Sequence, residues 1–206
     1  MRSIRPVQKV IDAFESLPGI GPKSAARLAY YLLHVPQERI EKMAAALSQL
    51  RLDTKVCKTC FNIGEDELCP VCADPSRDKS VICVVEQPLD LLAFEKSDGY
   101  QGVYHVLGGV ISPLSNIGPD DLFLPQLLER VKRGEIKELI LATNPSLEGE
   151  ATAMYIAQKI REDHGSAKGG RVIKITRIGR GLQTGAEVEY ADGSTLSRAL
   201  EGRTSF

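Results

Sequence analysis

The chain has 206 residues, 43% hydrophobic and 26% charged, within the range of ordinary soluble globular proteins. It has no apolar run of the roughly 18 residues that a membrane-spanning helix needs, and residues 1–3 do not begin a signal peptide. We therefore expect a cytoplasmic protein with no membrane association. Aromatic residues make up 5% of the chain and Trp is absent, which argues against a protein that binds single strands mainly by base stacking.

The net charge of −1 is divided unevenly along the chain. Residues 1–56 carry nine Lys or Arg against five Asp or Glu, whereas the remainder carries seventeen against twenty-two. A basic head on an acidic body suits a protein that meets phosphate at one end only. An uneven division of this size also arises by chance, so the charge pattern alone does not decide the matter.

The N-terminal segment, 1–53, is predicted to form a helical domain. Three stretches carry apolar residues at helical spacing: 6–17, 23–33 and 37–50. A proline leads each stretch, where it suits the first turn of a helix. In the second stretch, Leu28 and Leu32 are expected to face the interior.

A forced turn, Pro-Gly-Ile-Gly-Pro at 18–22, separates the first two stretches and resembles the turn of a helix-hairpin-helix motif. Gly19 and Gly21 allow the backbone to pass close to a phosphate, and the following helix start offers unpaired N–H groups. Lys23 and Arg27 lie four residues apart, on one face of that helix. Such contacts address the DNA backbone, so we expect sequence-independent DNA binding. The alternative is a plain tight turn between two core helices.

Four cysteines define a small module at 54–79. Cys57, Cys60, Cys69 and Cys72 form two CxxC pairs separated by eight residues, a spacing that predicts tetrahedral zinc binding. Disulfides are disfavoured inside a cell, and a redox CxxC would not need a second copy. All four ligands come from the protein, so the predicted site is structural. Cys83 lies within an apolar strand and is expected to be a small buried residue.

From residue 80 to 176 the pattern changes to alternating strands and helices, which predicts a parallel α/β domain. The predicted strands are 81–86, 102–107, 138–143 and 171–178. The predicted helices are 88–97, 120–133 and 148–163. A short strand and helix tail, 177–206, is too small to form a core alone. The whole chain is therefore predicted to be a multidomain α/β protein.

Polar residues follow two of the predicted strands, in an arrangement that resembles a Toprim domain. Glu86 ends the first strand, where that family places a glutamate, whereas the family's D-x-D acids are replaced by Asn144 and Ser146. Amide and hydroxyl oxygens bind a hard cation less well than carboxylates do. We therefore expect a degenerate site that carries no phosphoryl-transfer chemistry, and a protein that is not an enzyme.

Two sets of charged residues, one acidic and one basic, are each open to more than one interpretation. Glu148 and Glu150 are either ordinary acids at a helix N-terminus, or with Glu86 a partner-binding surface, or remnants of a metal site. Five cations fall close together without an acid among them, forming either a partner-facing surface or a second DNA contact: Lys168, Arg171, Lys174, Arg177 and Arg180.

The order of hairpin, zinc module, degenerate Toprim domain and tail resembles the RecR family of bacterial recombination mediators, over essentially the whole chain. The most specific segments are LPGIGPKSAARLA at 17–29, the CxxC pair, TNPSLEGEATA at 143–153 and ITRIGRGLQTGAEVEYADGSTL at 175–196.

The resemblance implies a homotetrameric ring that can encircle duplex DNA with the hairpins inside, and binding to both single- and double-stranded DNA. It also implies DNA repair and recombination at the bacterial nucleoid, where RecO and RecF act with the ring to load a recombinase at single-strand gaps. Lys23 and Arg27 would be DNA contacts, and the four cysteines zinc ligands. The competing hypotheses are a Toprim nuclease or primase with an altered metal set, and a zinc-ribbon adaptor with no DNA role.

Overall fold

A computed structural model describes residues 4–133, 135–165 and 173–203. The chain divides into two compact units, 1–54 and 55–206, which we describe separately. None of the helices in the described parts of the chain combines the length and the hydropathy that a bilayer span requires.

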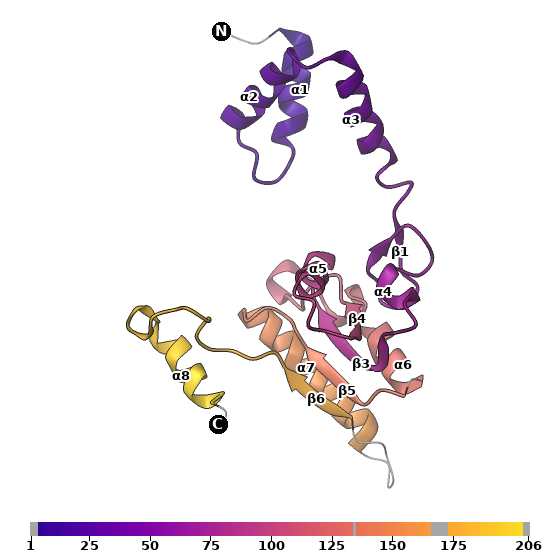
Figure 1. Ribbon diagram of the computed structural model, residues 1–206, viewed down its shortest axis with the longest axis vertical. Helices are drawn as coiled ribbons and strands as arrows, with labels where there is room; N and C mark the ends of the chain where they lie inside the picture. The colour runs from indigo at the N-terminus through magenta and orange to yellow at the C-terminus, as the bar shows by residue number, and fades with distance from the viewer. Residues whose placement is uncertain (1–3, 134, 166–172, 204–206) are drawn as a thin grey trace. The chain divides into compact units, whose positions relative to one another are not determined.

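The first unit is helical, as the sequence predicts, and comprises α1 (Arg5–Glu15), α2 (Pro22–Leu32) and α3 (Gln37–Gln49) (Figure 1). Val7 and Ile11 of α1 form a small core with Ala25 and Ala29 of α2. The expectation that Leu28 faces inward is wrong, since 40% of it is exposed. Ala25 and Ala29 take the inner positions because small side chains let the two helices approach closely.

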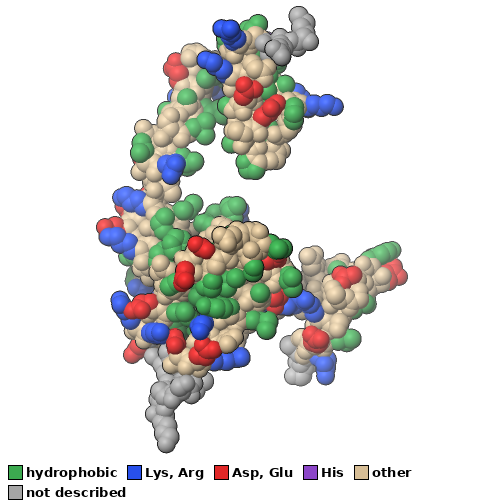
Figure 2. All heavy atoms as spheres, turned by 180° about the vertical axis from the view of Figure 1, so that it is seen from behind, with side chains coloured by type: hydrophobic (Ala, Val, Ile, Leu, Met, Phe, Trp, Pro, Cys, Tyr) green, Lys and Arg blue, Asp and Glu red, His purple; other side chains and the backbone are tan. Residues whose placement is uncertain are grey.

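The helix α3 presents its apolar residues to solvent. None of its residues is buried within the described chain, and three large side chains on it or at its end are between 43% and 64% exposed: Met43, Leu47 and Leu50. Figure 2 shows hydrophobic side chains on the surface of the helical unit. The helical spacing therefore predicts the helix correctly, but it does not identify the surface that the apolar face packs against.

The second unit begins with the cysteine module. Its elements are an antiparallel pair, β1 (Lys55–Val56) and β2 (Ile63–Gly64), and a single helical turn, α4 (Pro70–Ala73). The sheet that follows is built from four parallel strands: β3 (Asp78–Val85), β4 (Gly102–Val106), β5 (Glu138–Leu141) and β6 (Lys174–Arg177). Their order across the sheet is β4-β3-β5-β6. All four predicted strands are thus confirmed, apart from residues 171–172, which lie outside the described chain.

Three helices flank the sheet, α5 (Pro88–Lys96), α6 (Leu124–Arg133) and α7 (Leu147–Gly165). The helix α6 begins four residues later than the sequence predicts, because the 3-10 turn η2 (Pro119–Asp121) and an extended Leu122 precede it. A further 3-10 turn, η1 (Pro113–Ser115), lies in the connection before η2.

The C-terminal tail contains a 3-10 turn, η3 (Val188–Tyr190), and the helix α8 (Gly193–Glu201). Asp192 caps α8 by accepting hydrogen bonds from the backbone N–H groups of Ser194 and Thr195.

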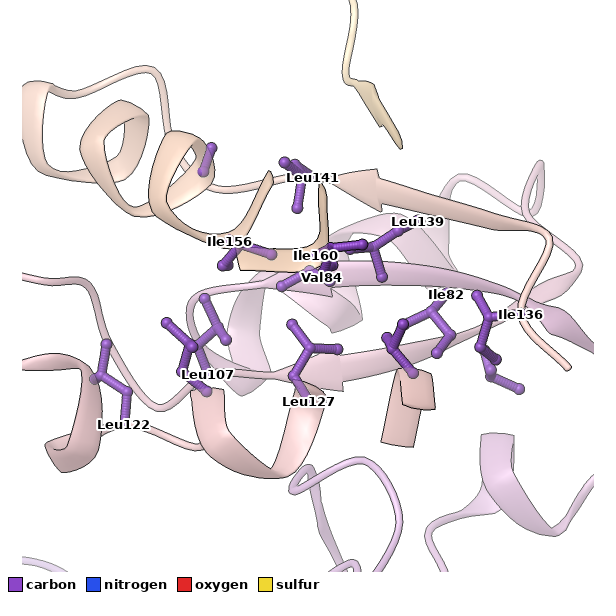
Figure 3. Packing of buried hydrophobic residues seen from close by; sticks show 14 residues of the cluster. Ile82, Val84, Leu107, Leu122, Leu127, Ile136, Leu139, Leu141, Ile156 and Ile160 are labelled. Carbon is purple, nitrogen blue, oxygen red and sulfur yellow. The ribbon is translucent and has the colours of Figure 1, made fainter. Parts of the chain in front are cut away.

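Both faces of the sheet are buried, as expected for parallel strands. Alternate residues of β3 enter different cores: Ile82 and Val84 pack with α6 and α7, whereas Cys83 and Val85 pack with α5 and the cysteine module. Figure 3 shows the first core, in which Leu127 of α6 and Ile156 of α7 are among the labelled side chains. The cysteine module is therefore part of the wall that covers one face of the sheet.

Candidate functional site

The four cysteines come together as the spacing predicts. Their sulfur atoms all lie within 4.8 Å of one another, and three of the four residues are fully buried. A zinc–sulfur bond of about 2.3 Å places tetrahedral ligands about 3.8 Å apart, so small shifts of the side chains bring this donor set around a zinc ion. Cys57 and Cys60 lie in the turn after β1, and Cys69 and Cys72 lie at the start and inside of α4. Together they form a structural zinc site.

The sulfur atoms compete for protons. The Sγ atoms of Cys60 and Cys69 are 3.4 Å apart, and this hydrogen bond raises the pKa of Cys60 while it lowers the pKa of Cys69. Four thiolates this close repel one another, and a divalent cation at their centre removes that repulsion. Cys83, by contrast, has a pKa raised to about 12 by burial, so it stays a neutral thiol as expected.

The zinc module is fixed to the sheet by backbone and ring contacts. The N–H of Val106, at the end of β4, donates to the carbonyl oxygen of Cys60 at 2.8 Å. Phe61, which adopts a φ of +62°, stacks on Phe123 with ring centroids 4.3 Å apart and meets His105 edge-on. His105 is fully buried, and burial lowers its pKa to about 4, so it is a neutral packing residue.

The glycine hairpin has the geometry of an open helix start. Gly19 adopts a φ of +82°, which explains the need for glycine, whereas Gly21 is extended and precedes α2 as its N-cap. No side chain caps this helix, and Pro22 lacks an N–H. The backbone N–H groups of Gly21, Lys23 and Ser24 are the first-turn donors that an α-helix leaves unpaired, and they favour an anion at this end.

Lys23 and Arg27 belong to one exposed face of α2. This face is opposite the buried Ala25 and Ala29, and neither cation has a salt-bridge partner in the described chain. Helical spacing places Tyr30 and Tyr31 on the same face, where they are 50% and 59% exposed. The sequence analysis missed these tyrosines, although their i+3 and i+4 spacing from Arg27 would have revealed them.

The polar residues at the sheet edge also meet. Glu86, 8% exposed, accepts hydrogen bonds from both the backbone N–H of Asn144, at 2.6 Å, and its side-chain Nδ2, at 2.7 Å. Ser146 Oγ accepts a hydrogen bond from the Gly149 N–H. A Cβ at Gly149 would clash with the Asn144 carbonyl oxygen and crowd Glu86, so glycine is required by this close approach. Asn144 thus satisfies both oxygens of the buried carboxylate through hydrogen bonds.

Glu150 is engaged by two arginines. Burial alone would raise its pKa, but hydrogen bonds from Arg180 and Arg177 outweigh that effect and lower it. Arg177 donates to Glu150 at 2.8 Å and also to the carbonyl oxygens of Leu141 and Thr143, which tie β6 to β5. Two of the five clustered cations, Arg177 and Arg180, are therefore engaged in ion pairs within the fold.

The other clustered cations are distributed differently. Lys174 pairs with Glu138 on the neighbouring strand, and Lys168 and Arg171 lie outside the described residues. Glu148 has no side-chain hydrogen bond or ion pair in the described structure, unlike Glu86 and Glu150. The partner-binding role of the three acids remains a prediction, and Glu148 is the one most available for it.

Comparison with known protein families finds a match for four segments of the chain. Residues 7–51 match the RecR helix-hairpin-helix, 54–74 the four-cysteine zinc finger domain of RecR, 80–177 the Toprim domain and 184–204 the RecR C-terminal region. The described strands and helices of 80–177 form the parallel sheet expected of a Toprim domain.

Curated relatives match over nearly the whole chain. A recombination protein RecR from Bifidobacterium adolescentis is 48% identical over 197 residues, which cover 96% of this chain and 94% of the relative. A recombination protein RecR from Bifidobacterium longum subsp. infantis is 47% identical over the same shares of both chains.

Replacing a zinc ligand is expected to unfold the module. Structural zinc contributes on the order of 10–16 kcal/mol in small modules, as much as a domain's whole typical stability. Cys57→Ser and Cys72→Ser should therefore give misfolded or poorly soluble protein, whereas Cys83→Ala should retain one zinc per chain by elemental analysis. Well-folded wild-type protein with clearly less than one zinc per chain would contradict this expectation.

Proposed function

The chain belongs to the RecR family of recombination proteins, and on that premise we propose that it is a non-catalytic mediator of DNA repair. It binds single- and double-stranded DNA without sequence preference, at the bacterial nucleoid in the cytoplasm. It acts as a ring of four copies, with RecO and RecF proteins as partners, to load a recombinase at single-strand gaps. The zinc site holds the fold together and takes no part in a reaction.

The open start of α2 carries the DNA-binding part of the proposal. The helix start offers unpaired N–H groups. Lys23 and Arg27, which pair with no acid in the described chain, share one face of α2 with the exposed Tyr30 and Tyr31. Each of these groups is a donor suited to phosphate oxygens, and none requires a particular base. A groove-reading role would need side chains placed against base edges, so the arrangement favours backbone binding.

The non-catalytic part of the proposal rests on the edge of the sheet. A magnesium site for phosphoryl transfer needs several carboxylate oxygens free to coordinate the ion. The only carboxylate at the matching positions, Glu86, has both oxygens hydrogen-bonded to Asn144. The enzyme hypothesis would require this pair to open and bind a divalent ion with a single acid.

The exposed apolar face of α3 supports the self-association that a ring requires. Met43, Leu47 and Leu50 lie on one stripe of a helix whose residues find no cover within the described chain. A second copy of the chain presents the same stripe, and burying two such faces against each other removes several large apolar side chains from water. Glu148, with its free carboxylate, is the acid we assign to RecO or RecF.

A salt titration tests the hairpin. Lys23→Ala and Arg27→Ala together should reduce the slope of log affinity against log salt by roughly 1.8 per contacting chain for duplex DNA, since each phosphate contact contributes about 0.9. The control is Lys42→Ala, which removes an exposed cation that pairs with Glu38 on α3. An unchanged slope in the double variant would place the DNA site elsewhere.

The sheet edge should be inert towards DNA. Purified wild-type protein is expected to show neither magnesium-dependent strand cleavage nor primer synthesis, and Glu86→Ala should behave identically because there is no activity to lose. The measurement is a sensitive end-labelled DNA assay. Cleavage by the wild type that disappears in Glu86→Ala would establish the enzyme hypothesis instead.

The mass in solution tests the ring. Light scattering of the wild type should give four times the mass of one chain, and Leu47→Glu should give smaller species because it places a charge in the α3 face. Leu114→Glu, at a 99% exposed position in η1, should leave the mass unchanged. A monomeric wild type would contradict the ring, and an intact tetramer in Leu47→Glu would remove α3 from the interface.

A further inference from the structure

One arginine of α6, Arg130, contacts both the sheet and the zinc module. Buried apolar residues of α6 face the sheet, whereas the partly buried Arg130 extends from the same helix to two backbone carbonyls. Its Nη1 donates to Tyr104 of β4 at 2.7 Å and lies 3.4 Å from the carbonyl oxygen of Thr59. Thr59 lies between Cys57 and Cys60, so the guanidinium is placed beside the first pair of zinc ligands.

Arg130 differs from the other partly buried arginines of this unit, which pair with carboxylates. Arg77 forms a two-pronged ion pair with Glu95, and Arg177 and Arg180 share Glu150. No carboxylate of the described residues lies within salt-bridge distance of Arg130. A guanidinium removed from water without a counter-charge is unfavourable, so a buried anion is expected near it.

Among the charged groups around Arg130, the cysteine sulfurs attract it most strongly. Burial lowers the pKa of Arg130, while attraction to the sulfurs of Cys72, Cys60 and Cys57 acts in the opposite direction. Arg130 and Cys72 also line the same cavity, of about 520 Å³, between the zinc module and the sheet. The contact with the Thr59 carbonyl and the shared cavity wall therefore place the cation beside the ligand set.

The charge of the zinc site supplies the missing partner. A zinc ion with four thiolates carries a net charge of −2, which a buried site must also neutralise. We propose that Arg130 is the positioning residue that balances this charge, so that zinc binding and docking of the module onto the sheet are coupled. The metal then joins α6 and β4 to the module through one electrostatic contact.

Neighbouring charged groups do not take this role. Lys58 is exposed and pairs with Glu67, and Arg133 is exposed and pairs with Glu129 on its own helix. Glu95 carries the opposite sign and lies close enough to Cys69 to feel its charge, but Arg77 pairs with it. Lys79 and Lys137 line the same cavity but are exposed, so among the described residues Arg130 is the partly buried cation beside the ligand set that has no acid of its own.

Three variants separate charge from hydrogen bonding. Arg130→Gln keeps a donor for the Tyr104 carbonyl but removes the charge, Arg130→Lys keeps a charged donor, and Arg133→Gln is the control on the surface of α6. Zinc affinity is obtained from competition with a chromogenic chelator. It is also obtained from the thermal midpoint over a series of free zinc concentrations, which gives an affinity even for a destabilised variant.

Arg130→Gln should bind zinc about 10- to 100-fold more weakly, the range typical of a lost outer-shell partner, while Arg130→Lys and Arg133→Gln remain near the wild type. In cobalt-substituted protein, the sulfur-to-cobalt charge-transfer band should move to lower energy in Arg130→Gln alone, because the thiolates lose a nearby positive charge. Equal zinc affinities and band positions in Arg130→Gln and Arg130→Lys would show a hydrogen-bonding role only and overturn the proposal.

Discussion

The cluster of four sulfurs, which fits one zinc ion, ties the cysteine module to the sheet of the second unit. It gathers two short chain segments with almost no secondary structure of their own, and it builds them into the layer that covers one face of the sheet. Cys57, Cys60, Cys69 and Cys72 share a core with Val85 and Tyr104, so the module is continuous with the α/β fold. Without the ion, the four thiolates would repel one another, and the face of the sheet that the module covers would become exposed to solvent.

The sheet edge shows how the fold satisfies a buried carboxylate through hydrogen bonds. Asn144 supplies two donors, its backbone N–H and its side-chain amide, one to each oxygen of Glu86. The buried carboxylate is satisfied and the loop before α7 is held in place, with Gly149 allowing the close approach. The start of α7 is therefore held to the end of β3 by hydrogen bonds within the fold.

Binding, in turn, requires groups that the fold leaves unsatisfied. The start of α2 has free N–H groups and two cations that pair with no acid among the described residues, whereas the cations Arg177 and Arg180 are paired with Glu150. The same residue types therefore have different roles, because ion pairing inside the fold lowers the attraction that a cation can offer to an external phosphate. This contrast places the proposed DNA surface at the hairpin.

The order of elements, the zinc ligands and the hairpin can be assigned from the amino-acid sequence, because these features depend on local spacing: two CxxC pairs, a glycine-rich turn, and apolar runs of strand or helix period. Which charges are free and which apolar faces are covered depends instead on tertiary packing. Leu28 has helical spacing yet lies outside, and Arg130 gives no local signal that it reaches the zinc module. Such contacts join residues many positions apart, so their partners are set by how helices and strands pack and not by any pattern along the chain.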